Sequence, residues 1–174
     1  MILRATTATL GLAAAALMLS GCLAPAPEPT PTPTAVFASE DEAFAAAEET
    51  YRAYVDAENA RWADPHSEPA PDSFLIGEAL EEQIEVNRQF REIGLRVVGE
   101  NHIERVDRIR ANSGTGETVL EVCIDATDSR VVDESNQDVT PANRAPQVLV
   151  RVEFVAVGDE LAIEKSVTAR EDGC

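Results

Sequence analysis

The stretch QVLVRVEFVAV, residues 147–157, is the strongest indication of the fold. Successive side chains in it belong to opposite faces, as they do in a β-strand. Gly158 and Asp159 follow it as a two-residue hairpin turn. Residues 161–169 then continue as a returning strand. The expected apolar faces of the two strands are Val148, Val150, Val152 and Phe154 on the first, and Leu161, Ile163 and Val167 on the second. The sequence therefore predicts an antiparallel hairpin with one face that must be buried.

Two further strand regions precede this hairpin. Residues 95–110 are rich in Val and Ile, with an expected break near Gly99, and residues 117–132 form a second long region. In the second region Leu120, Val122 and Ile124 alternate with Glu121, Cys123 and Asp125. Residues 112–116 are a hairpin loop and residues 133–146 a polar loop. The four regions predict an antiparallel meander.

A helix is expected in front of the strands, from Ser39 to about Trp62. Ser39 and Glu42 have the spacing of a capping box, and acidic residues in the first turn favour a helix N-terminus. Pro65 ends the helix. Its apolar stripe is predicted at helical spacing to consist of Phe44, Ala47, Tyr51, Tyr54, Val55 and Trp62.

A second helix is expected over residues 74–93, after a proline-rich connection at 65–72. Gly94 is suited to the position that follows a helix C-terminus. The predicted stripe consists of Leu75, Ala79, Leu80, Ile84, Val86 and Phe90. Two helices followed by an antiparallel meander predict an α+β domain with the helices packed on one face of the sheet.

The N-terminus has the pattern of an export signal. Arg4 gives a short positive segment, and residues 5–19 form an apolar run too short to span a bilayer comfortably. The following Leu19-Ser20-Gly21-Cys22 resembles the lipobox of bacterial lipoproteins. The resemblance implies cleavage between Gly21 and Cys22 and a diacylglyceryl group on the Cys22 sulfur. The alternative is an ordinary signal peptide with an incidental cysteine.

The chain is therefore expected in three parts: a signal peptide at 1–21, a lipidated Cys22 with a tether at 22–38, and one α+β domain at 39–174. Proline occupies every second position from Pro25 to Pro33, which favours an extended polyproline spacer of roughly 50 Å. The expected location is the extracytoplasmic face of the cell membrane, with the lipid anchor as the membrane contact.

Charge narrows the range of partners. The chain has a formal net charge of −18, and Arg4 is the one charge of the leader, so the rest carries −19. Such a surface repels phosphate backbones and anionic headgroups, so nucleic acid is excluded as an expected partner. No motif for a cofactor is present. The acidic loop from Asp125 to Asp138 lacks the spacing and glycine of an EF-hand, so no metal is expected.

The chain has three cysteines. If Cys22 carries lipid, Cys123 and Cys174 remain as a pair, and export to an oxidising compartment allows a disulfide between them. Two free thiols are the alternative. A metal site is not expected, because two cysteines without further ligands at suitable spacing do not make one.

Several segments of the domain resemble small actinobacterial lipoproteins with a nuclear-transport-factor-2-like, cone-shaped α+β fold. These segments are residues 49–54 (ETYRAY), 119–123 (VLEVC) and 130–133 (RVVD), together with the terminal Cys174. The resemblance implies a curved sheet that can enclose a pocket. The candidate pocket residues are Tyr51, Tyr54, Trp62 and His102. Isomerases and dehydratases of that superfamily use acid and base groups inside the cone.

No set of catalytic residues is apparent. His66 and His102 each have carboxylates nearby in sequence, which is a common surface arrangement. We expect a non-catalytic binding or interaction module at the cell envelope, with a small ligand or an envelope protein as partner. The alternatives are an isomerase- or dehydratase-like enzyme that uses the cone interior, and a structural subunit of an envelope complex. A carboxylate or His102 buried in an apolar pocket would favour the enzyme, and a filled cone would exclude it.

Overall fold

A computed structural model describes residues 35–170 and Cys174. The helical elements are α1 (Glu40–Ala63), η1 (Pro71–Phe74) and α2 (Gly77–Glu92). The strands are β1 (Arg96–Val98), β2 (His102–Ala111), β3 (Thr118–Asp125), β4 (Arg130–Val132), β5 (Gln147–Val157) and β6 (Glu160–Arg170). None of the helices in this described part is both long and apolar enough to cross a membrane.

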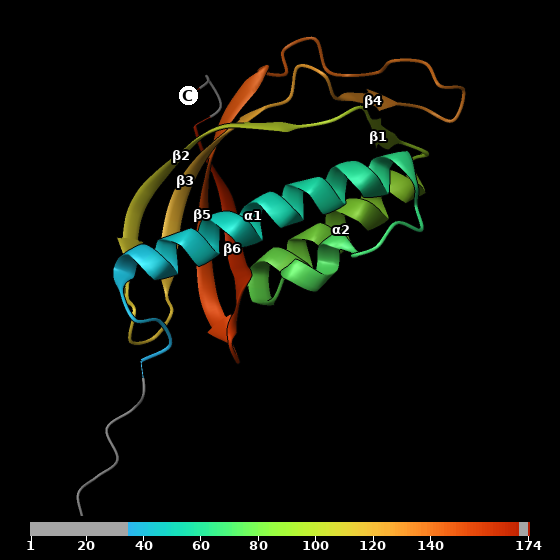
Figure 1. Ribbon diagram of the computed structural model, residues 1–174. Coiled ribbons are helices and arrows are strands. Elements are labelled where there is room, and N and C mark those ends of the chain that lie inside the picture. The colour runs from blue at the N-terminus through green and yellow to red at the C-terminus, as the bar shows by residue number, and fades with distance from the viewer. Residues whose placement is uncertain (1–34, 171–173) are drawn as a thin grey trace, which may run out of the picture. The chain divides into compact units, whose positions relative to one another are not determined.

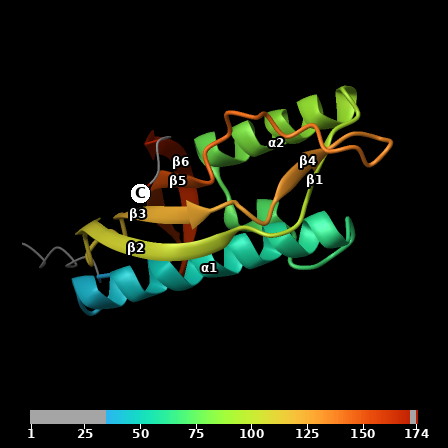
Figure 2. The same cartoon turned by 90° about the horizontal axis from the view of Figure 1, so that it is seen from above.

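Both helices pack on one face of a curved antiparallel sheet (Figure 1). The strand order of the main sheet is β2-β3-β5-β6. The view from above in Figure 2 separates the helices, with α1 running beside β2 and α2 lying on the side of β6. The predicted α+β class, with N-terminal helices on a curved antiparallel sheet, is confirmed.

The register of β3 and β5 explains which side chains fill the interior. Leu120 is paired with Val152, and Val122 with Val150, so the expected apolar faces of the two strands coincide. Their odd-numbered neighbours point to the other face, as the alternation predicted. The buried core cluster consists of Phe37, Ala43, Ala47, Tyr51, Val55, Leu75, Ala79, Ala111, Leu120, Val122, Ile124, Val152, Phe154, Leu161 and Ile163.

Each of the two long strand regions is broken at the same level of the sheet. Gly99 has a φ of 90° and lies so close to the Asp128 carbonyl that a β-carbon there would collide with it. Residues 126–129 form the matching turn on the other region. The segments beyond the breaks, β1 and β4, pair with each other as a separate two-stranded sheet. The break expected near Gly99 is thus present, and residues 117–132 are two strands rather than one.

The second helix begins later than predicted, at Gly77 instead of residue 74. Residues 71–74 form the short helix η1, and Leu75 makes a bridge to Ile163 of β6. The Ile76 N–H donates to the Ile163 carbonyl at 2.9 Å. This pairing covers part of the free edge of β6, and it takes the backbone groups that an earlier helical turn would have used.

Val167 does not share a face with Leu161 and Ile163, contrary to the sequence prediction. Ile163 pairs with Phe154, whereas Lys165 pairs with Glu153, so one extra residue lies between them as a β-bulge. A bulge reverses the faces of all residues beyond it. Val167 therefore pairs with Arg151 on the face of the sheet away from the helices.

The apolar stripe of α2 is narrower than predicted. Ala79 is buried, and Leu80 packs against the core, but Ile84 and Val86 are 52% and 41% exposed. The helix lies against the edge of the sheet and not across its middle, so one row of side chains is enough to cover the contact.

Ser39 and Phe37 hold the N-terminal end of the described domain in place. The Ser39 side chain caps α1 by accepting from the Glu42 N–H at 3.1 Å, as predicted. Phe37 is already part of the core, and its N–H donates to the Ser113 carbonyl in the loop between β2 and β3. The chain therefore enters the domain at the hairpin end of the sheet. The lipobox with Gly21 and Cys22 lies outside the described residues.

A disulfide joins Cys123 of β3 to Cys174, as expected. Cys123 points away from the helices and is 1% exposed. The bridge closes a loop with a sequence separation of 51, which corresponds to about 4 kcal/mol of stability in the chain-entropy treatment. The bond ties the C-terminal residue to the outer face of the sheet.

Candidate functional site

An inner cavity of about 350 Å³ lies between the two helices and one half of the sheet. It is at the end of the sheet away from the loop at 112–116. The lining residues come from both helices, from the connection between β1 and β2, and from three strands of the main sheet. They include Tyr51, Tyr54, Val55, Glu58, Glu82, Asn101, Ile124, Val148, Val150, Ser166 and Thr168. The cone interior is therefore open at this end.

Glu58 gives the inner cavity its chemistry. Burial, reinforced by the charge of Asp72, raises the pKa of this carboxyl to about 7, although a hydrogen bond with Tyr54 acts in the opposite direction. Part of the residue stays accessible, as its place on the cavity wall requires. Burial and the nearby Glu58 also raise the pKa of the Tyr54 hydroxyl well above its usual range. Near neutral pH this carboxyl can therefore either accept or donate a proton.

Helical geometry places Glu58 on the wall. It follows Tyr51, Tyr54 and Val55 at intervals of seven, four and three residues, which all return to the same face of α1. The sequence prediction included the aromatic stripe but not the carboxylate within it. A Glu that interrupts an apolar stripe at helical spacing was the available signal. Only the position of the sheet shows that this part of the stripe faces a cavity.

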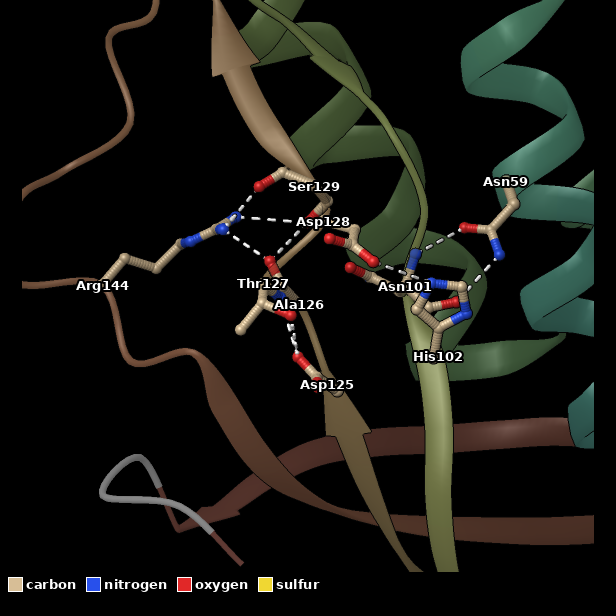
Figure 3. A network of polar contacts seen from close by, with 9 residues as sticks. All are labelled: Asn59, Asn101, His102, Asp125, Ala126, Thr127, Asp128, Ser129 and Arg144. Atoms are coloured by element: carbon tan, nitrogen blue, oxygen red, sulfur yellow. Dashed lines mark hydrogen bonds and ion pairs between the residues drawn. The ribbon is translucent and has the colours of Figure 1, made fainter.

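An amide pair positions one wall of the inner cavity. The Asn59 side chain donates to the Asn101 carbonyl and accepts from the Asn101 N–H, both at 2.9 Å (Figure 3). These two bonds hold the connection between β1 and β2 against α1. Asn101 Oδ1 is shielded from solvent, and no donor reaches it within the described residues.

The four candidate pocket residues do not all meet in one place. Tyr51 and Tyr54 line the inner cavity, with ring centroids 5.8 Å apart. Trp62 lies in a separate hollow of about 320 Å³ at the end of α1, which shares Glu58 with the inner cavity. His102 is half-exposed at the start of β2, and its Nε2 lies 3.4 Å from Asp128 Oδ2 (Figure 3). The structure thus brings the two tyrosines together with Glu58 and leaves His102 outside the cavity lining.

A further hollow, of about 410 Å³, adjoins the inner cavity and shares Val148 and Thr168 with it. We call it the loop hollow, because residues 141–145 form one side. Its one charged lining residue, Arg144, is already engaged: the guanidinium donates to the carbonyls of Ala126 and Ser129, each at 2.6 Å (Figure 3). This arginine stabilises the turn between β3 and β4.

The described residues around these cavities do not form a metal site. Within residues 35–170 and Cys174, no group of three or more His, Cys, Asp or Glu side chains is arranged to hold a metal ion. The inner cavity itself offers the protonatable carboxyl of Glu58, a second carboxylate from Glu82, two phenols, an amide, two aliphatic hydroxyls and an apolar floor. This arrangement suits the binding of a small molecule, with proton transfer at Glu58.

Solved structures resemble this chain to different degrees. The intermembrane-space region of the chloroplast protein ARC6 superposes with a TM-score of 0.52 at 12% identity, over 70% of this chain and 92% of that one. Aln2 from a Streptomyces species gives a TM-score of 0.46 at 13% identity, over 78% of this chain and 95% of that one. The beta subunit of benzoate 1,2-dioxygenase from Burkholderia mallei gives 0.38 at 11% identity, over 75% and 89%.

At these identities the similarity to the ARC6 region is one of fold alone. No family model matches the chain, and no curated protein matches it in sequence. Function therefore has to be inferred from the cavity itself.

Proposed function

We propose that this protein is a membrane-anchored envelope lipoprotein whose cone interior binds a small molecule. One observation carries the binding function, namely an inner cavity of about 350 Å³ that holds Glu58 in contact with Tyr54. Ligand sites commonly have volumes of at least about 300 Å³ and contain polar groups that orient the ligand. A domain that served only as a spacer would gain nothing from a carboxylate placed in its interior, where burial opposes its charge.

Filling the cavity tests this function. A mixture of small aromatic fragments is screened by ligand-observed NMR against wild type and Ser166→Phe. We expect wild type to bind fragments at one competitive site, and Ser166→Phe to lose them because the ring occupies the inner cavity. Asn143→Phe, which fills the loop hollow, is the matched control and keeps the fragments. Fragments that bind Ser166→Phe as well as wild type, with both variants folded, would contradict the proposal.

Proton transfer inside the cavity, of the isomerase or dehydratase type, is a second candidate function. The supporting observation is the Glu58 carboxyl, whose pKa burial raises to about 7. Such a group is suited to abstract a proton from a substrate and return it at another atom. Tyr54 is the positioning partner, since its hydroxyl is hydrogen-bonded to the carboxyl.

The Glu58 carboxyl can be titrated directly by carbon-detected NMR. Because the Tyr54 hydroxyl lowers the pKa of Glu58, Tyr54→Phe should raise it further. A Glu58 that titrates near pH 4.5 in wild type would remove the support for proton transfer at neutral pH, and would leave binding unaffected.

The anchoring part of the proposal rests on Leu19-Ser20-Gly21-Cys22. Cys22→Ser should move the protein from the membrane fraction to the soluble fraction or block its maturation. Unchanged fractionation would contradict the anchor.

A further inference from the structure

We infer that the inner cavity is selective for a small organic cation, an ammonium group attached to an apolar body of about ten non-hydrogen atoms. This inference rests on the proposed binding function and specifies its ligand. A cavity of about 350 Å³ has room for roughly a dozen water-sized groups, at the roughly 30 Å³ that a water molecule takes up in the liquid.

The charges on the cavity wall are all of one sign. Glu58 lines it from α1 and Glu82 from α2, and among the described residues that line it none is basic. Asp72 of η1 is close enough to raise the pKa of Glu58. An anionic ligand would be repelled by Glu82 and by the ionised form of Glu58 on the wall, and by Asp72 in the neighbouring hollow. Of these three groups Glu58 is partly buried, and there Coulomb interactions are stronger than in water.

Two basic side chains near the cavity are bound to other groups, and a third lies in the neighbouring hollow. Lys165 Nζ lies 2.8 Å from Glu78 Oε2. The Arg61 guanidinium, in the hollow next to Glu58, donates to the carbonyls of Pro65 and Ser67 at 2.9 and 2.7 Å. Arg91 of α2 also lines that hollow rather than the inner cavity. None of these three residues supplies a counter-charge on the cavity wall.

The uncharged groups on the wall also suit a cation. Tyr51 and Tyr54 stand next to each other with their rings inclined at 42°, and the face of a tyrosine ring attracts an ammonium group. Asn101 also lines the wall, and its neutral amide adds no positive charge that would oppose a cation. Val148, Val150 and Ile124 form the apolar floor for the rest of the ligand.

Three probes with the same ring and different charge test the inference. Cyclohexylmethylammonium, cyclohexylmethanol and cyclohexanecarboxylate are titrated into the full chain at pH 7 by isothermal titration calorimetry. We expect the ammonium probe to bind at least tenfold more tightly than the alcohol, and the carboxylate not to bind. Because a bound cation favours the ionised form of Glu58, binding should release protons, seen as a heat that depends on the ionisation enthalpy of the buffer.

Two isosteric variants locate the effect. Glu58→Gln should weaken the ammonium probe at least tenfold, abolish the proton release and change the alcohol less than threefold. Glu49→Gln removes the same charge from the exposed side of α1 and should change the ammonium probe less than twofold. Thermal unfolding checks that both variants are folded.

These experiments distinguish cation selectivity from small-molecule binding in general. If the alcohol or the carboxylate binds as tightly as the ammonium probe, the selectivity for cations is overturned and the binding function stands. Equal losses in Glu58→Gln and Glu49→Gln would also overturn it, because the attraction would then come from the net charge of the protein. If none of the three probes binds, both the inference and its basis in the cavity fail.

Discussion

The two ends of the cone are made from the same helix and the same strands, yet one is filled and the other is open. At the closed end, next to the loop at 112–116, α1 presents Ala43 and Ala47, and the sheet presents Leu120, Phe154 and Ile163, all at most 1% exposed. At the open end, α1 presents Tyr54 and Glu58 to Val148 and Thr168.

Side-chain size accounts for the difference. Small residues on the helix let the sheet approach at the closed end, where large sheet side chains fill the remaining volume at the density of a protein interior. At the open end the large residues stand on the helix and hold it away from small residues on the sheet. Glu58 adds to the separation, since a carboxyl needs either water or a hydrogen-bond partner. The closed end therefore stabilises the fold, whereas the open end forms the candidate binding site.

The closed end should be where truncation costs most. Phe154→Ala is expected to lower the free energy of unfolding by about 3–5 kcal/mol, because it leaves a large cavity in a region that cannot collapse. Urea denaturation measures the change. Val157→Ala, on the same strand but 55% exposed, is the control, and its effect should stay below about 0.5 kcal/mol. A Phe154→Ala loss as small as that of the control would contradict a filled end.

The open end should gain stability when its carboxylate is removed. Since burial raises the pKa of Glu58 to about 7, the folded state holds this proton more tightly than the unfolded chain does. The resulting stability is complete below about pH 4.5 and is lost as the pH rises through about 7. Glu58→Gln should therefore be more stable than wild type by about 1–3 kcal/mol at pH 8, and equally stable near pH 4.5.

Urea denaturation of wild type and Glu58→Gln across this pH range is the measurement. Glu49→Gln, at an exposed position of the same helix, controls for the change in net charge and should stay parallel to wild type. A difference between wild type and Glu58→Gln that does not vary with pH would show that the carboxyl is not held in the interior.

Two valines of β5 lie on either side of the boundary between the closed and the open end. Truncating them should give the smallest changes in the free energy of unfolding. Val150 and Val152 lie on the same face of β5, but Val152 is fully buried whereas Val150 lines the inner cavity. Val152→Ala should cost about 2 kcal/mol, and Val150→Ala less than about 1 kcal/mol, because the second site already has free volume beside it. Equal losses in chemical denaturation would mean that the cavity does not extend to Val150.

The regular parts of the fold could be predicted from local pattern. Alternation placed Leu120, Val122 and Ile124 on the inner face of β3, and the capping box began α1 at Ser39. The strand faces and the helix start depend on neighbours a few residues away, so the sequence contains what is needed to infer them. The predicted Cys123–Cys174 pair also forms, and that prediction came from the expected lipidation of Cys22 and not from local pattern.

The sequence predictions were wrong where contacts between segments far apart in the chain determine the local structure. The bulge that reverses Val167 is set by the pairing of β5 with β6, and the late start of α2 by the bridge from Leu75 to Ile163. Neither contact is visible from the periodicity of one segment. Trp62 and His102 were expected near the two tyrosines, but the turn of the helix and the start of β2 place them elsewhere.

The sequence alone determined which segments are helical, which are strands and which faces of β3 and β5 are apolar, because periods of 3.6 and 2 residues are local properties. Only the tertiary structure decided that Glu58 is a site residue. Its pKa depends on how closely β3, β5 and β6 approach α1 and on the position of Asp72. The environment of a charge is a property of the packed fold, which no local pattern encodes.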